Sequence, residues 1–167
     1  MKANAEASQQ EIVVSLEEFL TVTDCPPEWR NHDLYLFRDG DLVFYVGQSQ
    51  NAFDRVWEHL RGAFKGRSVV GRFVLCNWPR SMRFTIELLD SKAPRFSSLG
   101  DKPDAAERYL IEQLSPCFNE AVNVSATPLP DRYLPPNARI RHLKSLKRMI
   151  REAGYAMRLR GNRRPWK

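Results

Sequence analysis

Residues 34–60 read LYLFRDGDLVFYVGQSQNAFDRVWEHL and join a hairpin pattern to a helix pattern. Two runs rich in β-branched and aromatic residues, LYLFR and LVFYVG, flank the turn sequence DGD, whose glycine supplies the positive φ that a tight turn needs. A two-residue turn would place Tyr35 opposite Phe44, whereas a three-residue turn places Tyr35 opposite Tyr45. We favour the three-residue turn, which brings both phenols to one face of the hairpin.

Residues 51–60 predict a helix that follows the hairpin, with Asn51 as its N-cap. Apolar side chains recur there at the i, i+3, i+4, i+7 spacing of a core-facing stripe. They are Phe53, Val56, Trp57 and Leu60. Arg55 and His59 lie beside this stripe, and because they are four residues apart, both can reach one common point.

Caps and prolines predict further elements on both sides of this stretch. Ser15 and Glu18 form a capping-box pattern for a short N-terminal helix. Residues 83–89 have the pattern of a third strand. Asp104 is expected to cap a helix that ends before Pro116, because proline excludes its predecessor from helical geometry.

The C-terminal part begins with a proline-rich connector. Asn137 is then expected to cap a basic helix that Gly154 closes. Residues 68–79, SVVGRFVLCNWP, fit either a helix or an irregular cover of the core, and their periodicity does not separate the two.

Together these elements predict an α/β (α+β) fold: a small, mainly antiparallel three-stranded sheet flanked by helices, with a basic C-terminal helix. At 167 residues the chain can bury one core but is too short for two ordinary domains and a linker. We therefore expect an N-terminal extension with a short helix (1–30), one central domain (31–122), and a proline-rich connector with a basic helical segment (123–167).

Charge is distributed unevenly along the chain. Residues 131–167 contain twelve Lys and Arg against two acidic residues, whereas residues 1–130 contain fourteen against eighteen. A basic segment of this kind indicates a polyanionic partner, with nucleic acid as the first candidate and an acidic membrane surface as the second; a cationic helix that only aids solubility is the alternative. The residues expected to bind nucleic acid are Arg141, Lys144, Lys147, Arg148, Arg151, Arg158, Arg160, Arg163 and Arg164. Removal of the chain after Pro135 is expected to weaken this binding while leaving the fold intact.

Composition argues against a membrane protein and a secreted one. No apolar run approaches the roughly 20 residues of a membrane span. The first ten residues lack the apolar core of a secretory signal, so we expect a cytoplasmic protein without membrane contact. Cys25, Cys76 and Cys117 do not have the paired spacing of a zinc site and are expected to be free, mostly buried thiols.

The residues of the opening stretch resemble the signature of the GIY-YIG nuclease superfamily. Residues 34–35, LY, stand at the end of the family's G-I-Y, and residues 45–47, YVG, stand at its Y-I-G. Arg55 follows Tyr45 by ten residues and His59 follows Arg55 by four, as in the family pattern. The resemblance implies a GIY-YIG nuclease-like central domain.

The resemblance continues beyond the hairpin and its helix. The carboxylate expected on a later helix falls on Glu107, and the asparagine expected past that helix falls on Asn119, within PCFN. The pattern departs at Asp33, where the family has glycine, which puts the local backbone shape in question but removes no catalytic group. Glu87, Asp90 and Glu112 lack the family spacing and are interpreted as surface or supporting carboxylates.

The family resemblance implies an endonuclease that hydrolyses DNA phosphodiester bonds with one divalent cation, Mg²⁺ or Mn²⁺ as its substitute, and no organic cofactor. Glu107 would hold the cation, because Mg²⁺ keeps most of its waters and needs only one or two carboxylates. Arg55 would bind a phosphate oxygen. Tyr35 is expected to act as the base and Tyr45 to orient the water or phosphate, or the reverse; a cation must lower the base's pKa. His59 would relay the proton or hold a phosphate oxygen.

Further residues would shape the site or position phosphate: Gly47, Gln48, Ser49 and Asn119. Taken singly, every one of these residues also has a purely structural interpretation, and their joint spacing favours the nuclease. The sequence leaves open a restriction, defence, mobile-element or DNA-processing role, and a homodimer or protein partner. The alternative function is a non-catalytic nucleic-acid-binding module or a subunit of a larger nucleoprotein assembly.

Overall fold

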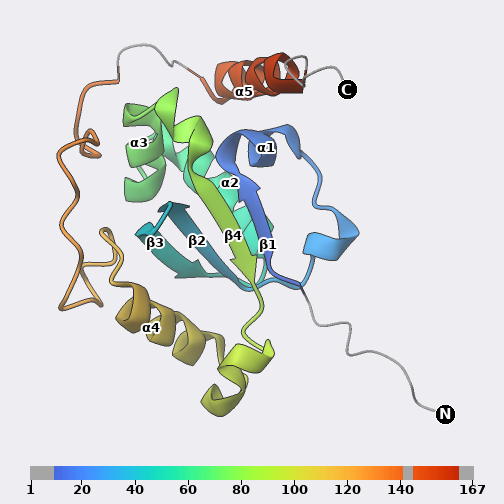
Figure 1. Cartoon of the computed structure of the whole chain (residues 1–167), viewed down its shortest axis with the longest axis vertical. Coiled ribbons are helices and arrows are strands. Elements are labelled where there is room, and N and C mark those ends of the chain that lie inside the picture. The colour runs from blue at the N-terminus through green and yellow to red at the C-terminus, as the bar shows by residue number, and fades with distance from the viewer. Residues whose placement is uncertain (1–9, 141–144, 162–167) are drawn as a thin grey trace, which may run out of the picture.

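The computed structural model describes residues 10–140 and 145–161, within which four strands form one antiparallel sheet in the order β1-β4-β2-β3 (Figure 1). The strands are β1 (Ile12–Ser15), β2 (Leu34–Asp39), β3 (Leu42–Gln48) and β4 (Thr85–Leu89). The mixed fold with an antiparallel sheet is confirmed, but the predicted count of three strands is too low. The missed strand is β1. It has only four residues, and its partner β4 is distant in sequence, so no hairpin turn next to it predicts a strand.

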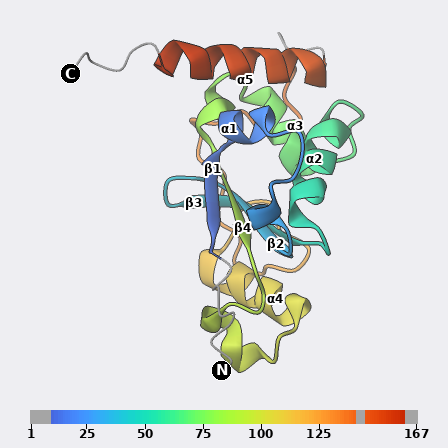
Figure 2. The same cartoon turned by 90° about the vertical axis from the view of Figure 1, so that its right-hand side faces the viewer.

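Helices cover both faces of the sheet and extend beyond it. They are α1 (Leu16–Thr21), α2 (Ala52–Ala63), α3 (Val69–Cys76), α4 (Pro103–Leu114) and α5 (Leu146–Gly161), with single helical turns η1 (Pro27–Trp29), η2 (Arg80–Arg83) and η3 (Pro94–Leu99). Figures 1 and 2 show α5 next to α1 at one end of the molecule and α4 at the other end. None of the helices in the described part of the chain is long and apolar enough to cross a membrane.

Two apolar cores lie on opposite faces of the sheet because side chains alternate along each strand. On β2, Tyr35 and Phe37 belong to the larger core, which is completed by α1, α2, α3 and α5. Leu34 and Leu36 belong to the smaller core, which is completed by α4 and η3. The three cysteines are free, with Cys76 and Cys117 buried and Cys25 half-buried, as predicted.

The hairpin register differs from both predicted alternatives. Tyr35 pairs with Gly47, and Phe37 pairs with Tyr45. The next pair after the turn joins Arg38 to Val43, so β3 has one extra residue, and that residue is a β-bulge. The register prediction was wrong for two reasons. The turn is formed by Gly40 and Asp41, because Asp39 already pairs with Leu42, and the bulge interrupts the ladder that was assumed to be unbroken.

The bulge has a direct consequence for the larger core. Phe44 and Tyr45 are neighbours in sequence, yet both contact that core instead of facing opposite sides of the sheet. Phe44 is completely buried, and Tyr45 is half-buried at its edge. Tyr35 and Tyr45 therefore share a face, as expected, although they are not directly opposite each other.

Three N-caps were predicted before the C-terminal segment: Ser15, Asn51 and Asp104. The first two are confirmed. The Ser15 hydroxyl accepts a hydrogen bond from the Glu18 amide at 3.2 Å, and the Asn51 side chain accepts one from the Asp54 amide at 3.2 Å. Asp104 is not a cap. The helix α4 already starts at Pro103, because proline is favoured in the first turn, where its missing N–H costs nothing. It ends at Leu114, before Pro116, as predicted.

The basic helix begins later than the sequence indicates. The helix α5 starts at Leu146, with the Ser145 hydroxyl accepting a hydrogen bond from the Arg148 amide at 3.2 Å. The predicted cap Asn137 lies outside the helix, and Gly154 lies within it. Tertiary contacts explain the difference at Asn137.

Residues 135–138 form a turn beside α3, in which the Ala138 amide donates to the Pro135 carbonyl at 3.0 Å. The Arg72 guanidinium donates to the carbonyl oxygens of Pro136 and Ala138, at 3.1 and 3.4 Å, and therefore competes with a helical turn there. Residues 141–144, which include part of the predicted helix, lie outside the described residues.

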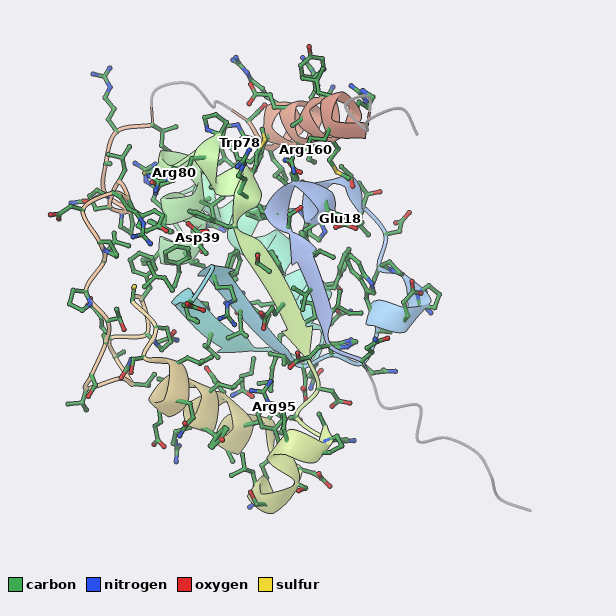
Figure 3. All side chains as sticks on the ribbon, in the orientation of Figure 1. Glu18, Asp39, Trp78, Arg80, Arg95 and Arg160 are labelled. Carbon is green, nitrogen blue, oxygen red and sulfur yellow. The ribbon has the colours of Figure 1, made fainter. Side chains whose placement is uncertain are left out.

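The helix α5 is part of the larger core. Met149 and Ala153 are completely buried in it. The Trp78 indole N–H donates to Glu152 at 2.6 Å, and Arg160 forms an ion pair with the buried carboxylate of Glu17. Figure 3 shows Trp78 and Arg160 where α5 meets the rest of the chain. Removing this segment would therefore uncover core residues, contrary to the expectation that the fold is independent of it.

Met149→Ala tests this packing. We expect the free energy of unfolding to fall by about 2–4 kcal/mol, because a completely buried methionine is truncated and leaves a cavity. Leu159→Ala, on the same helix but 40% exposed, should change it by less than about 0.5 kcal/mol. Urea unfolding of both variants measures the difference; equal, small losses would contradict a core role for α5.

Candidate active site

The centre of the candidate site is the contact between Tyr35 and Gly47 on neighbouring strands. Tyr35 is only 1% exposed, and its ring lies against the Gly47 backbone. A Cβ at position 47 would come closer than 3.0 Å to the ring carbons and the hydroxyl of Tyr35. Glycine is therefore required here by close approach, and it sets where the phenol oxygen lies.

The Tyr35 hydroxyl is held by a hydrogen-bond chain that starts in α3. Ser68, the N-cap of α3, accepts from the Gly71 amide at 3.0 Å and lies 2.7 Å from Nδ1 of His59. Nε2 of His59 lies 2.8 Å from the Tyr35 oxygen. Two tautomers of His59 fit these distances: the Ser68 hydroxyl donates to Nδ1 while Nε2–H donates to Tyr35, or the Tyr35 hydroxyl donates to Nε2 while Nδ1–H donates to Ser68. Ser68 was missed by sequence reasoning because residues 68–79 were not assigned; its capping pattern was the available signal.

His59 is neutral in this position. Burial, and after it the nearby Arg55 charge, lower its pKa to about 4 against the opposing effect of Glu58. A second glycine makes the burial possible, since a Cβ at Gly71 would clash with the His59 carbonyl oxygen. The helices α2 and α3 can therefore approach closely at His59. With both nitrogens engaged, the imidazole holds the Tyr35 oxygen in a fixed position.

Tyr45 and Arg55 complete a cluster with Tyr35 and His59. The Tyr45 ring centroid lies 6.1 Å from that of Tyr35 and 5.4 Å from that of His59. Burial and the neighbouring Tyr45 raise the pKa of Tyr35, while the Arg55 guanidinium lowers it without cancelling the rise. Arg55 is partly exposed and pairs with Glu58 at 2.6 Å. The structure thus brings these four predicted residues together.

Glu107 lies on the other side of the sheet end. Gln48 follows Gly47 on β3 and points to the opposite face, where its carboxamide hydrogen-bonds Asp104 and Glu107 on α4. Burial and the negative charge of Asp104 raise the pKa of Glu107. These two carboxylates line a cavity of about 250 Å³ that is separate from the cavity beside Arg55 and His59.

Asn119 has a structural role that its position in the sequence did not reveal. Its side-chain carbonyl accepts from the Val46 amide and its NH₂ donates to the Val46 carbonyl, both at 2.9 Å. The Cys117 and Phe118 amides donate to the carbonyls of Val43 and Phe44. Asn119 therefore imitates a strand residue and closes the outer edge of β3 up to Val46.

The departure from the family pattern at Asp33 has a clear local explanation. The Asp33 carboxylate accepts hydrogen bonds from the amide and the hydroxyl of Ser91, at 2.7 and 2.6 Å. Its carbonyl accepts from the Ser49 amide at 2.9 Å. Asp33 thus ties the start of β2 to the end of β4, and Ser49 belongs to the turn between β3 and α2.

The predicted nucleic-acid-binding residues fall into three groups. Arg148 and Arg160 pair with Glu152 and Glu17, respectively. The others in α5 are exposed: Lys147, Arg151 and Arg158. The rest lie outside the described residues: Arg141, Lys144, Arg163 and Arg164.

Among residues 10–140 and 145–161, no group of three or more His, Cys, Asp or Glu side chains could hold a metal ion by itself. At the candidate site, Glu107 and Asp104 are two carboxylates close enough to affect each other's charge, but they are a pair and not a group of three. None of the protein-family models, curated proteins or solved structures matches this chain.

Gly47→Ala should destabilise the fold by about 1–3 kcal/mol, because the added methyl group must displace the Tyr35 ring from a packed position. Gly154→Ala is the matched control. A Cβ there meets only the end of the Arg158 side chain at 3.8 Å, so in the middle of a helix it should stabilise by about 0.5–1 kcal/mol. Urea unfolding and near-UV circular dichroism measure the effects; a neutral Gly47→Ala with an unchanged aromatic spectrum would contradict the close contact.

The free energy of unfolding should decrease as the pH falls from 7 to 5, because of His59. Its pKa is about 4 in the folded chain and 6.5 ordinarily, so in this range the unfolded chain binds more protons and a lower pH favours unfolding. The expected loss is about 2 kcal/mol. His59→Gln cannot titrate and should lack this part of the pH dependence in urea unfolding at both pH values. Parallel losses in the parent and the variant would disprove the buried neutral state.

Proposed function

We propose that this chain is a divalent-metal-dependent DNA endonuclease. The observation that supports the proposal best is the cluster of Tyr35, Tyr45, Arg55 and His59 beside the end of β3. Residues with the chemistry for phosphodiester hydrolysis meet there, on elements of the type and order that the resemblance to GIY-YIG nucleases implies. The catalytic carboxylate of the proposal is Glu107.

The proposed reaction is an in-line attack by water on a phosphodiester. The water oxygen forms the new bond to phosphorus, the bond to the 3′ oxygen breaks, a base takes the water proton, and solvent returns a proton to the leaving oxygen. Arg55 is the cation available for the phosphate oxygens, because its guanidinium is partly exposed and has a fork of donors.

Burial supports Tyr45, in place of Tyr35, as the residue that meets the water. Tyr35 is almost fully buried, its oxygen is held by His59, and its pKa is raised. Tyr45 is half-buried at the edge of the same cluster. Tyr35 would then position Tyr45 and the phosphate, which reverses the assignment favoured from sequence.

The donor set on α4 fits Mg²⁺. Glu107 and Asp104 offer hard carboxylate oxygens, and their mutual repulsion raises the pKa of Glu107, which a bound dication would relieve. When bound, the ion would neutralise the extra negative charge on the phosphate. Glu107 would hold it, with Asp104 and the Gln48 carboxamide beside it.

The proposal places one phosphate at the end of β3, between the two halves of the site. The strand is at the sheet edge, and the segment ending in Asn119 covers that edge only up to Val46. Beyond it, Gly47 has the phenols on one face and Gln48 has Glu107 on the other. A phosphate beside these two residues would contact both faces.

One observation favours a second candidate function. Glu107 and Arg55 line separate cavities, which also fits a nucleic-acid-binding module that does not cut. Such a module would use the exposed cations but would need neither tyrosine nor Glu107. The two functions therefore differ in their response to substitutions that leave charge on the basic surfaces unchanged.

Cleavage of supercoiled plasmid in Mg²⁺ or Mn²⁺ tests the enzyme. The parent should nick or linearise DNA, EDTA should abolish the activity, and Glu107→Gln should reduce the rate by at least about 100-fold, because the metal carboxylate is lost. Glu18→Gln, exposed on α1 and outside the cavity that Glu107 lines, should cut at the parent rate. No cutting of duplex, branched or single-stranded DNA by the parent would favour the binding module.

The same assay ranks the tyrosines. If Tyr45 meets the water, Tyr45→Phe should lose more activity than Tyr35→Phe at neutral pH, and both variants should fold. A larger loss in Tyr35→Phe would restore the assignment made from sequence.

A further inference from the structure

We propose that the turn between α2 and α3 is a phosphate-binding surface that receives the nucleic-acid backbone next to the candidate active site. Eight residues line this turn cavity: Arg55, Glu58, His59, Arg61, Gly62, Lys65, Arg67 and Ser68. Its volume is about 330 Å³. The inference rests on the proposed function only for the identity of the polymer. It assigns binding to Arg61, Lys65 and Arg67, which are not among the binding residues predicted from the sequence.

The backbone of the turn holds these cations in place. The Arg67 amide donates to the Gly62 carbonyl at 2.9 Å, and the Lys65 amide donates to the same oxygen at 3.0 Å. Gly66 has a positive φ of 67°, which lets the chain reverse within a few residues. Lys65 and Arg67 are therefore brought back beside Arg61, on a turn with little freedom to rearrange.

The charges of the turn cavity are not neutralised from within the protein. Its one carboxylate, Glu58, pairs with Arg55 at 2.6 Å. Arg61, Lys65 and Arg67 are exposed, and in the described part of the chain no salt bridge involves them. Arg61 lies over the Trp57 ring, 5.9 Å from its centroid, which steadies the side chain without cancelling its charge. Three exposed cations around one hollow attract a polyanion.

The turn cavity is continuous with the candidate active site. His59 lines the cavity and also bonds to Tyr35, and Arg55 lines it while its charge lowers the pKa of Tyr35. A polymer with an anion at each repeat can therefore place one phosphate at the phenols and the next ones at the turn. A nucleic-acid strand meets this requirement, because its charge recurs at every nucleotide along a stiff backbone.

The helix α5 offers a weaker surface for the same partner. Arg148 and Arg160 are engaged by carboxylates within the protein. The exposed cations Lys147, Arg151 and Arg158 lie on the helix that packs against α1. The turn cavity has the same number of unpaired cations, and two residues of its lining, Arg55 and His59, interact with Tyr35.

The experiment compares two triple variants that remove the same charge. R61Q/K65Q/R67Q alters the turn cavity, and K147Q/R151Q/R158Q alters α5. Affinity for a fluorescein-labelled duplex is measured by anisotropy in EDTA, so that no cutting occurs, at several salt concentrations. The turn variant should bind about tenfold or more weakly and show a smaller salt slope, because up to three phosphate contacts are lost. The α5 variant should lose less than about threefold.

Two further measurements keep the outcome decisive. The double variant K65Q/R67Q leaves the Arg61 contact with Trp57 in place and should show an intermediate loss, and thermal unfolding checks that all variants fold. Equal losses in the two triples, a larger loss in the α5 triple, or displacement of the duplex by polyglutamate as efficiently as by unlabelled DNA would each overturn the inference. A parent that binds DNA through the turn cavity but cuts none would refute the nuclease and leave the binding surface standing.

Discussion

The candidate site depends on one close approach, that of the Tyr35 ring to the Gly47 backbone. No side chain can stand at position 47 while the phenol lies there. The contact fixes the phenol oxygen, His59 holds that oxygen from α2, and Ser68 holds His59 from α3. A second glycine, Gly71, permits α3 to approach α2 closely enough for this to happen. Two positions without side chains thus determine where the chemically active groups lie.

Local patterns predicted the elements on which the site is built, and they failed where distant contacts decide. The caps Ser15 and Asn51 act over three residues and were predicted correctly. Strand β1 was missed because it forms through pairing with the distant β4. The start of α5 was predicted too early because Arg72 hydrogen-bonds the chain next to Asn137 and competes with a helical turn there. The bulge in β3 allows both Phe44 and Tyr45 to pack in the larger core, and rules for turn sequences do not take such packing into account.

The candidate site was predictable to the extent that it is local. One stretch of hairpin and helix contains Tyr35, Tyr45, Arg55 and His59. Their spacing in sequence therefore largely determines that they lie close together in the fold. Glu107 comes from the other face of the sheet, and spacing alone does not tell on which side of Gly47 a later helix packs. Asn119 shows a further limit. Its amide pairs with both polar groups of Val46, which explains an asparagine without any catalytic role.

Charge shows most clearly why a sequence and a structure can indicate different surfaces. The C-terminal segment has the highest density of cations, yet Arg148 pairs with Glu152 on the same helix and Arg160 pairs with Glu17 on α1. The second pair helps to attach α5 to the rest of the protein. The turn between α2 and α3 has fewer cations in sequence, but three of them meet around a hollow with no carboxylate left for them. Attraction for a polyanion follows the charge left unpaired after folding. In the proposed nuclease this charge borders the cluster of phenols and imidazole, so binding and chemistry would act on one strand.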